Sequence, residues 1–153
     1  MENCMKITNT FLFLLMITAG ALAQSSPVKW SFAAKKINAS EYELVLTAQM
    51  AKGWYVYSQY LESDAGPIPT SFTFAINDDF ELVGQTLEKG DRKEGYDEIF
   101  GMNLIKFAGK ADFVQPIRLQ RKMHQVSGTL EFMTCDDEQC LPPRTIDFTI
   151  DLQ

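Results

Sequence analysis

Apolar and polar residues alternate along most of this chain, and the alternation restricts its fold class more than any other feature. Every second residue is apolar between positions 42 and 50, and the same period returns at 28–32, 71–76 and 146–152. A period of two is typical of strands with one buried face. No amphipathic segment longer than a turn or two has helical spacing. The sequence therefore predicts an all-β protein.

Turn-forming residues divide the chain into eight or nine short strands. The expected breaks lie at Gly53, at 64–69, at 77–79, at the charged segment 88–94 and at Gly109-Lys110. The last of these should join strands 104–108 and 111–119 into a hairpin. Short strands spaced by about 8–12 residues favour an immunoglobulin-like antiparallel β-sandwich. A closed barrel is the alternative architecture.

The first 23 residues resemble a secretory signal peptide. Lys6 gives a weakly positive start, residues 11–17 form an apolar run, and Ala21-Leu22-Ala23 fits an A-x-A cleavage site. The run is too short to span a bilayer. We expect a mature single domain, residues 24–153, in which Cys4 has been removed and two cysteines remain. An even number of cysteines in an exported chain is compatible with a disulfide.

Composition excludes several classes of function. The formal net charge is −6, which argues against nucleic acid, since nucleic-acid binding needs a basic face. His124 is the sole histidine, and one histidine with two cysteines does not make a zinc site. No nucleophile elbow or phosphate-binding loop is present. We expect no metal and no cofactor, and the thiol pair is the chemistry that remains.

Cys135 and Cys140 flank a short acidic loop, Asp136-Asp137-Glu138-Gln139, between two alternating segments. The two cysteines should therefore face each other across a β-hairpin with a short loop. Opposed residues in antiparallel strands have Cα atoms about 4.5–5.5 Å apart, within the range of about 4.4–6.8 Å that a disulfide needs. The pair can close without moving the backbone.

Residue chemistry alone leaves the role of this bond open. A structural disulfide is common in exported domains. However, closing so short a loop stabilises a chain by only about 2 kcal/mol, against nearly 5 kcal/mol for a loop of about 100 residues. The position at a loop tip also leaves the sulfurs within reach of a partner. Both a structural and a redox-active bond fit the residues.

Three motifs, in this order along the chain, resemble the N-terminal periplasmic domain of DsbD, a bacterial transmembrane disulfide reductase. Residues 53–57, Gly-Trp-Tyr-Val-Tyr, resemble its aromatic segment beside the thiols. Residues 96–101, Tyr-Asp-Glu-Ile-Phe-Gly, resemble its cap loop. Residues 135–143, from the first cysteine to Pro142-Pro143, resemble its active-site hairpin. The resemblance covers nearly the whole expected mature chain and agrees with the predicted immunoglobulin-like sandwich.

The resemblance implies a role for each matching residue. Cys135 and Cys140 would form the redox pair. The other implied residues line or cap it: Tyr55, Tyr57, Asp97, Glu98, Ile99 and Phe100. Three departures from the family pattern stand out: the loop between the cysteines is short, Ile99 occupies the cap position of the family's phenylalanine, and the sequence ends at Gln153 without the family's membrane and thioredoxin-like domains. Read from the residues alone, the aromatic side chains are ordinary core packing.

The function implied is a periplasmic thiol–disulfide exchange domain of a Gram-negative bacterium. It would relay reducing equivalents through a mixed disulfide. A separate thioredoxin-like or membrane reductase would supply electrons, and periplasmic thiol–disulfide proteins would accept them. The alternatives are a binding or adhesion module with a structural disulfide, and an envelope-assembly subunit or chaperone-like partner that recruits others through a sheet edge.

Overall fold

The protein is described by a computed structural model, which covers residues 26–61 and 65–153. The expected leader, residues 1–23, lies outside the described residues. Nine strands form the described part: β1 (Val28–Lys36), β2 (Glu41–Met50), β3 (Tyr55–Tyr57), β4 (Ser71–Phe74), β5 (Phe80–Leu82), β6 (Leu87–Asp97), β7 (Met102–Leu119), β8 (Gln125–Cys135) and β9 (Cys140–Asp151). In these residues no helix is long and apolar enough to cross a membrane.

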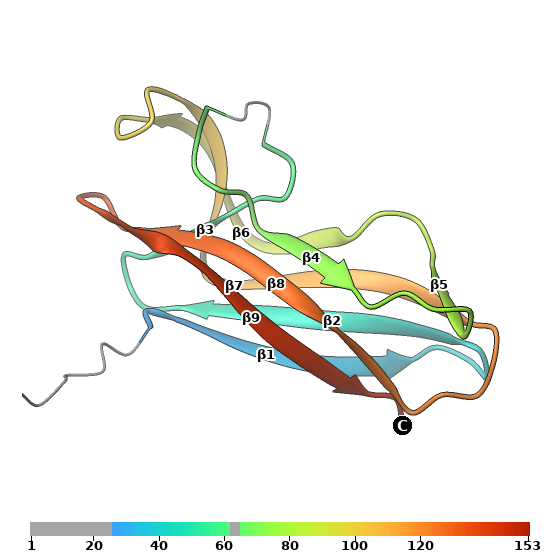
Figure 1. The fold of residues 1–153 in the computed structure, drawn as a ribbon. Helices are drawn as coiled ribbons and strands as arrows, with labels where there is room; N and C mark the ends of the chain where they lie inside the picture. Colours follow the sequence, from blue (N-terminus) through green and yellow to red (C-terminus); the bar gives the residue numbers. More distant parts are fainter. Residues whose placement is uncertain (1–25, 62–64) are drawn as a thin grey trace, which may run out of the picture.

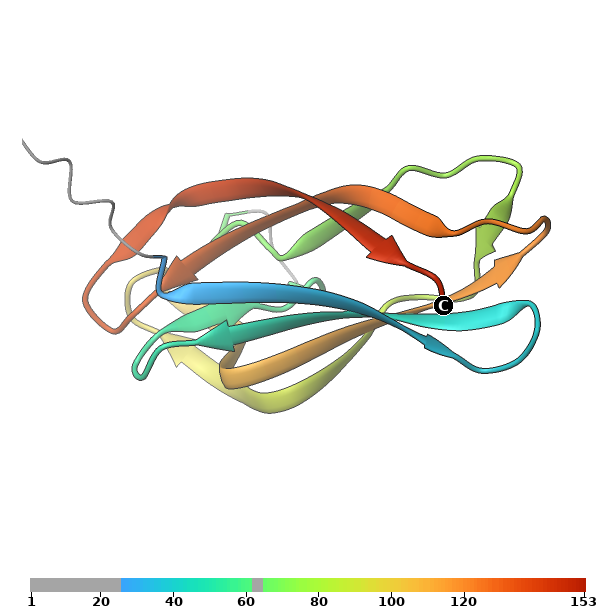
Figure 2. The same cartoon turned by 90° about the horizontal axis from the view of Figure 1, so that it is seen from below.

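The strands form two antiparallel layers that one short strand joins (Figure 1; Figure 2). One layer runs β1-β2-β7, with β5 and β6 along the other edge of β7. In the second layer β8 lies between β9 and β4. Strand β3 pairs with β7 and also with β8, so it links the layers at one end of the molecule. The predicted antiparallel β-sandwich is confirmed.

The core lies between the layers and is built from the alternating faces that the sequence predicted. Its central side chains are each at most 2% exposed. They are Leu44 and Leu46 of β2, Phe113 of β7, and Leu130 and Phe132 of β8. On β2 and β8 the residues next to these are half-buried or exposed. Burying each large apolar side chain contributes about 1.5–3 kcal/mol. The alternation therefore accounts directly for the two-layer packing.

The predicted hairpin around Gly109-Lys110 is wrong. Strand β7 runs through this point without turning, and Gly90 and Asp91 of β6 pair with Ala111 and Ala108. The two residues between them form a bulge, which the positive φ of Gly109 (61°) permits. At the same place β7 exchanges one neighbour, β2, for another, β3. Glycine marks both turns and bulges, so its presence alone could not distinguish them.

The charged segment 88–94 is a strand and not the expected turn. It belongs to β6, whose residues from Leu87 to Tyr96 are exposed or half-buried. With no buried face, this strand shows no apolar alternation, so periodicity could not reveal it. Together β6 and β7 form a long arm whose turn lies at the cysteine-bearing end of the molecule (Figure 1).

Two expected strands are shorter in the structure. Strand β4 ends at Phe74, and Ile76 beyond it is 62% exposed. Strand β5 ends at Leu82. The backbone N–H of the next residue, Val83, still donates a hydrogen bond to the carbonyl of Pro116 in β7. A proline has no N–H to return that hydrogen bond, so the pairing is interrupted before β6 begins.

Candidate functional site: the disulfide hairpin and its cap turn

The last residue of β8 and the first of β9 carry the disulfide. Cys135 and Cys140 are register partners, with an S–S distance of 2.05 Å and Cα atoms 4.0 Å apart. The N–H of Asp136 donates to the carbonyl of Gln139 at 2.9 Å, which closes the loop between them. The predicted hairpin with facing cysteines is confirmed, and its Cα separation is somewhat below the expected range.

Asp136 organises this loop with its side chain. Its Oδ1 accepts hydrogen bonds from the N–H groups of Glu138 (2.9 Å) and Gln139 (2.8 Å). These two backbone hydrogen bonds favour the ionised carboxylate and hold the pKa of Asp136 below its ordinary value. The loop therefore keeps a negative charge directly beside Cys135 at neutral pH.

The two cysteines differ in burial. Cys135 is 1% exposed and forms a small apolar cluster with Tyr57 and Leu104, separate from the main core. Cys140 is half-buried and packs at the edge of that cluster. Cys140 is therefore the more accessible cysteine of the pair.

Strand β3 places both predicted tyrosines beside the disulfide. Tyr55 is the register partner of Cys135, and its carbonyl accepts a hydrogen bond of 2.7 Å from the Thr134 hydroxyl. Val56 faces the main core, whereas Tyr57 is buried against Cys135 in the small cluster. Burial, with a smaller contribution from the charge of Asp97, raises the pKa of Tyr57 above its ordinary value. Tyr57 is thus uncharged beside Cys135.

Asp97 organises the β6–β7 turn, the segment that the sequence predicted as a cap. One oxygen of the Asp97 carboxylate accepts the N–H groups of Ile99 (3.1 Å) and Phe100 (3.4 Å). The Asp97 carbonyl accepts the N–H of Gly101 at 2.8 Å. Gly101 has a φ of 66°, which a glycine adopts without strain. These contacts define residues 97–101 as one tight turn, called the cap turn below.

The two apolar residues of the cap turn point to different surroundings. Phe100 packs against the cysteine cluster and meets the Tyr57 ring edge-on at 6.0 Å between centroids. Ile99 is 45% exposed. The structure therefore packs Phe100 against the cluster that contains Cys135, and it leaves Ile99 at the rim.

A cavity of about 310 Å³ separates the cap turn from the disulfide loop. Carboxylates from both sides line it, namely Asp97 and Glu98 from the cap turn and Asp136 and Asp137 from the loop. Glu98 is exposed. Lys106 of β7 is the cation among the lining residues, and it donates to the second oxygen of Asp97 at 2.9 Å. The rim of the site is consequently acidic.

Several residues of the site were not predicted from the sequence. Lys106 is one, although a single cation in the otherwise apolar segment 104–108 was a visible signal. The others complete the apolar cluster around Cys135: Leu61, Met102, Leu104 and Met133. They carry no signal of their own, because apolar residues in strands usually belong to a core.

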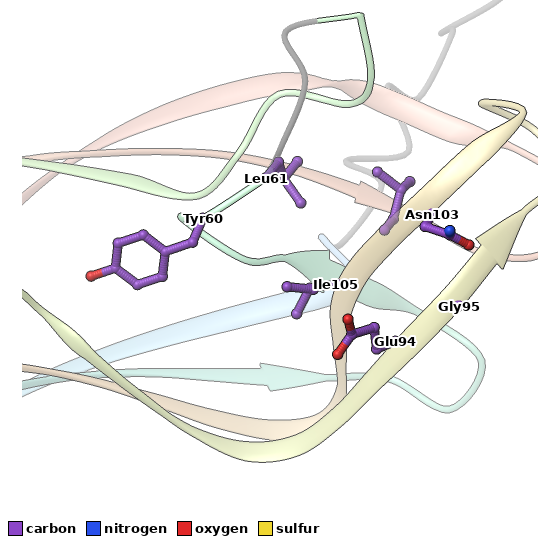
Figure 3. Close-up of a pocket in the computed structure, with 7 residues that line it drawn as sticks. Tyr60, Leu61, Glu94, Gly95, Asn103 and Ile105 are labelled. Carbon is purple, nitrogen blue, oxygen red and sulfur yellow. The ribbon is translucent and has the colours of Figure 1, made fainter.

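A second cavity, of about 290 Å³, lies beside the arm between β6, β7 and the segment after β3 (Figure 3). Leu61 and Ile105 point into it. Glu94 on its wall already pairs with Arg92 at 2.6 Å. Among the described residues, no group of three or more histidine, cysteine, aspartate or glutamate side chains is placed to bind a metal. The second cavity therefore adds no reactive group to the disulfide site, and the described residues add no metal site.

Comparisons with known proteins agree with this geometry. The family model "Thiol:disulfide interchange protein DsbD, N-terminal" matches residues 23–152. The reduced N-terminal domain of DsbD from Neisseria meningitidis has a TM-score of 0.53 and 18% identity, covering 83% of this chain and 91% of that one. The N-terminal periplasmic domain of ScsB from Proteus mirabilis has a TM-score of 0.45 and 15% identity, covering 82% and 44%. A search of curated proteins gave no match. The Neisseria domain confirms the immunoglobulin-like fold.

Proposed function

The chain belongs to the family of DsbD N-terminal domains, and from this premise we propose that it exchanges thiols and disulfides with partner proteins in the periplasm. Reducing equivalents would pass through the Cys135–Cys140 pair. The observation that carries the proposal is the disulfide itself, which lies at a hairpin tip with one cysteine half-buried and a cap turn beside it. Residues 1–23 would be the cleaved leader and residues 24–153 the working domain.

The order of attack in the exchange follows from the unequal burial of the two cysteines. A partner's thiolate attacks Cys140, the S–S bond breaks, and Cys135 leaves as a thiolate that takes up a proton. The partner's second thiol then attacks its own sulfur in the mixed disulfide and releases Cys140. The partner is oxidised to a disulfide, and this domain gains two electrons and two protons. The reverse sequence reduces an acceptor.

The surroundings favour a slow, partner-dependent reaction. The negative charge of Asp136 beside Cys135 disfavours a thiolate there. Phe100 packs against the cysteine cluster and restricts approach from solvent. Tyr55, Tyr57, Asp97, Glu98 and Ile99 would serve as the walls and rim of this site. A thioredoxin-like or membrane reductase would supply the electrons, and periplasmic thiol–disulfide proteins would accept them.

Trapping of mixed disulfides tests the proposal. Purified and reduced Cys135→Ser, Cys140→Ser and the double variant are mixed with a thioredoxin probe and analysed on non-reducing gels. The probe has its resolving cysteine replaced by serine and its remaining thiol activated as a mixed disulfide with thionitrobenzoate. Cys135→Ser should accumulate a mixed disulfide through Cys140 with release of thionitrobenzoate, because neither protein then holds a second thiol that can resolve it. Cys140→Ser should form much less, and the double variant none.

The alternative is a binding module in which the disulfide only stabilises the hairpin. In that case neither single variant forms a mixed disulfide faster than an unstructured cysteine peptide does. The double variant would then lose up to about 2 kcal/mol of unfolding free energy and keep its binding partners.

A further inference from the structure

Lys106 holds an unusual position in the sheet. Its backbone pairs with Tyr57 of β3 on one side and with Lys93 of β6 on the other. Like charges directly opposite each other destabilise a sheet. The side chain of Lys106 is only 22% exposed, whereas that of Lys93 is 50% exposed and pairs with Asp91. Lys106 therefore occupies a place where an apolar residue would be less costly to bury.

The ammonium group of Lys106 makes two contacts that join separate parts of the site. It donates to Oδ2 of Asp97 at 2.9 Å, and it lies 4.4 Å from the centre of the Tyr55 ring. Tyr55 is the register partner of Cys135. A cation over an aromatic ring is attracted by the ring's electrons. Lys106 thus connects the strand beside the disulfide to the base of the cap turn.

Asp97 depends on this cation. Its side chain is 6% exposed, and its other oxygen holds the N–H groups of Ile99 and Phe100. Removing one partner of a buried ion pair leaves an uncompensated charge, which is strongly destabilising. Without Lys106, the Asp97 carboxylate would recover its hydration most easily by leaving the turn. The hydrogen bonds that place Phe100 would then be lost.

We propose that Lys106 is a positioning residue for the redox pair: by binding Asp97 it keeps the cap turn, and with it Phe100, closed over Cys135 and Cys140. The proposal rests on the proposed exchange function and names what controls access to the same site. Glu98, Asp136 and Asp137 line the same cavity as Lys106, so these carboxylates surround the Lys106 side chain with negative charge. Lys106 affects the sulfurs only indirectly, through its ion pair with Asp97.

A purely electrostatic role would have the opposite sign. A nearby cation favours thiolates, so its removal would lower the thiolate fraction and slow alkylation at neutral pH. Loss of cap closure would instead raise the rate constant of the thiolate itself. A pH–rate profile separates the two effects, because the midpoint reports ionisation and the plateau reports access.

The test measures alkylation of the fully reduced protein by iodoacetamide between about pH 6 and 11, a range that extends well above the ordinary thiol pKa of about 8.5. Lys106→Met should raise the plateau rate about tenfold, which corresponds to about 1.4 kcal/mol in the closing equilibrium of the cap turn. Lys106→Arg keeps the charge and its donors and should stay within about threefold of the original protein. Lys110→Met is the matched control, because Lys110 lies on the same strand and pairs with Asp112 at 3.1 Å, away from the cap turn.

A double-mutant cycle addresses folding. Asp97→Asn with Lys106→Met replaces the ion pair by two uncharged residues, so no buried charge is left unpaired. If Lys106 acts through Asp97, the double variant alkylates no faster than the faster of the two single variants. Thermal unfolding of every variant shows whether the fold is retained at the assay temperature.

Three results would overturn the proposal: an unchanged plateau in Lys106→Met, an equal increase in Lys110→Met, or additive effects of the two substitutions in the double variant. The assay uses a small reagent and no partner protein. A failure of partner exchange would therefore contradict the proposed function and leave the alkylation result intact, and the two outcomes are distinguishable.

Discussion

At the scale of single residues, Asp136 shows how the hairpin loop affects both stability and reactivity. Its carboxylate accepts two backbone N–H groups, and these lower its pKa from the ordinary value of 3.8. A group with a lowered folded-state pKa stabilises the protein above its unfolded pKa and loses that contribution as the pH falls through the folded pKa. The difference in melting temperature between Asp136→Ala and the original protein should be constant near neutrality and shrink below about pH 4.

Reactivity is tested by the isosteric change Asp136→Asn. An amide oxygen can still accept both N–H groups, so the turn persists while the negative charge is removed. We expect the pKa of the neighbouring thiol to fall and alkylation at pH 7 to rise about two- to threefold. Asp147→Asn, an exposed aspartate of β9 away from the loop, should leave the rate unchanged. A slower reaction in Asp136→Asn would contradict the electrostatic account.

At the scale of elements, the cap turn separates what the motif predicted from what the structure adds. The motif predicted shielding by Ile99 or Phe100, and only Phe100 packs against the cysteine cluster. The order of residues in a tight turn does not reveal which side chain points inward, because that depends on how Asp97 and Gly101 close the turn. The alternation of β8 and β9, in contrast, predicted the facing cysteines correctly.

Single alanine substitutions in the cap turn should therefore have unequal effects. Phe100→Ala removes the ring that contacts Tyr57. We expect alkylation of the reduced thiols to accelerate about tenfold, which corresponds to a free energy of about 1.4 kcal/mol for moving Phe100 away from the thiols. Ile99→Ala should change the rate less than about twofold, since half-exposed side chains contribute little packing. Equal effects of both changes would argue against Phe100 as the cover.

The β6–β7 arm contains a close approach that tests the observed bulge. A Cβ atom on Gly90 would lie 2.5 Å from the carbonyl oxygen of Lys110, and the φ of Gly90 is 152°. Gly90→Ala should therefore lower the unfolding free energy by about 1–3 kcal/mol. Gly95→Ala is the control on the same strand, because nothing lies within 4 Å of its added Cβ. Urea denaturation that finds the two variants equally stable would contradict the bulged pairing.

At the scale of the whole molecule, the sandwich concentrates its chemistry at one end. Strand β3 joins the two layers there, the hairpin of β8 and β9 ends there, and the arm of β6 and β7 turns there (Figure 1). The alternation of apolar and polar residues predicted the two layers, because a strand with one buried face needs an apolar residue at every second position. It did not predict β6, whose exposed faces need no pattern, or the pairing of β3 with both layers, which depends on contacts distant in sequence.

The redox role of this end is the central claim, and the reduction potential of the Cys135–Cys140 pair tests it most directly. Equilibration against glutathione buffers with thiol trapping gives the value. We predict a potential between about −180 and −270 mV, where exchangeable dithiols lie. A value well below about −300 mV would identify a structural disulfide and contradict the exchange function.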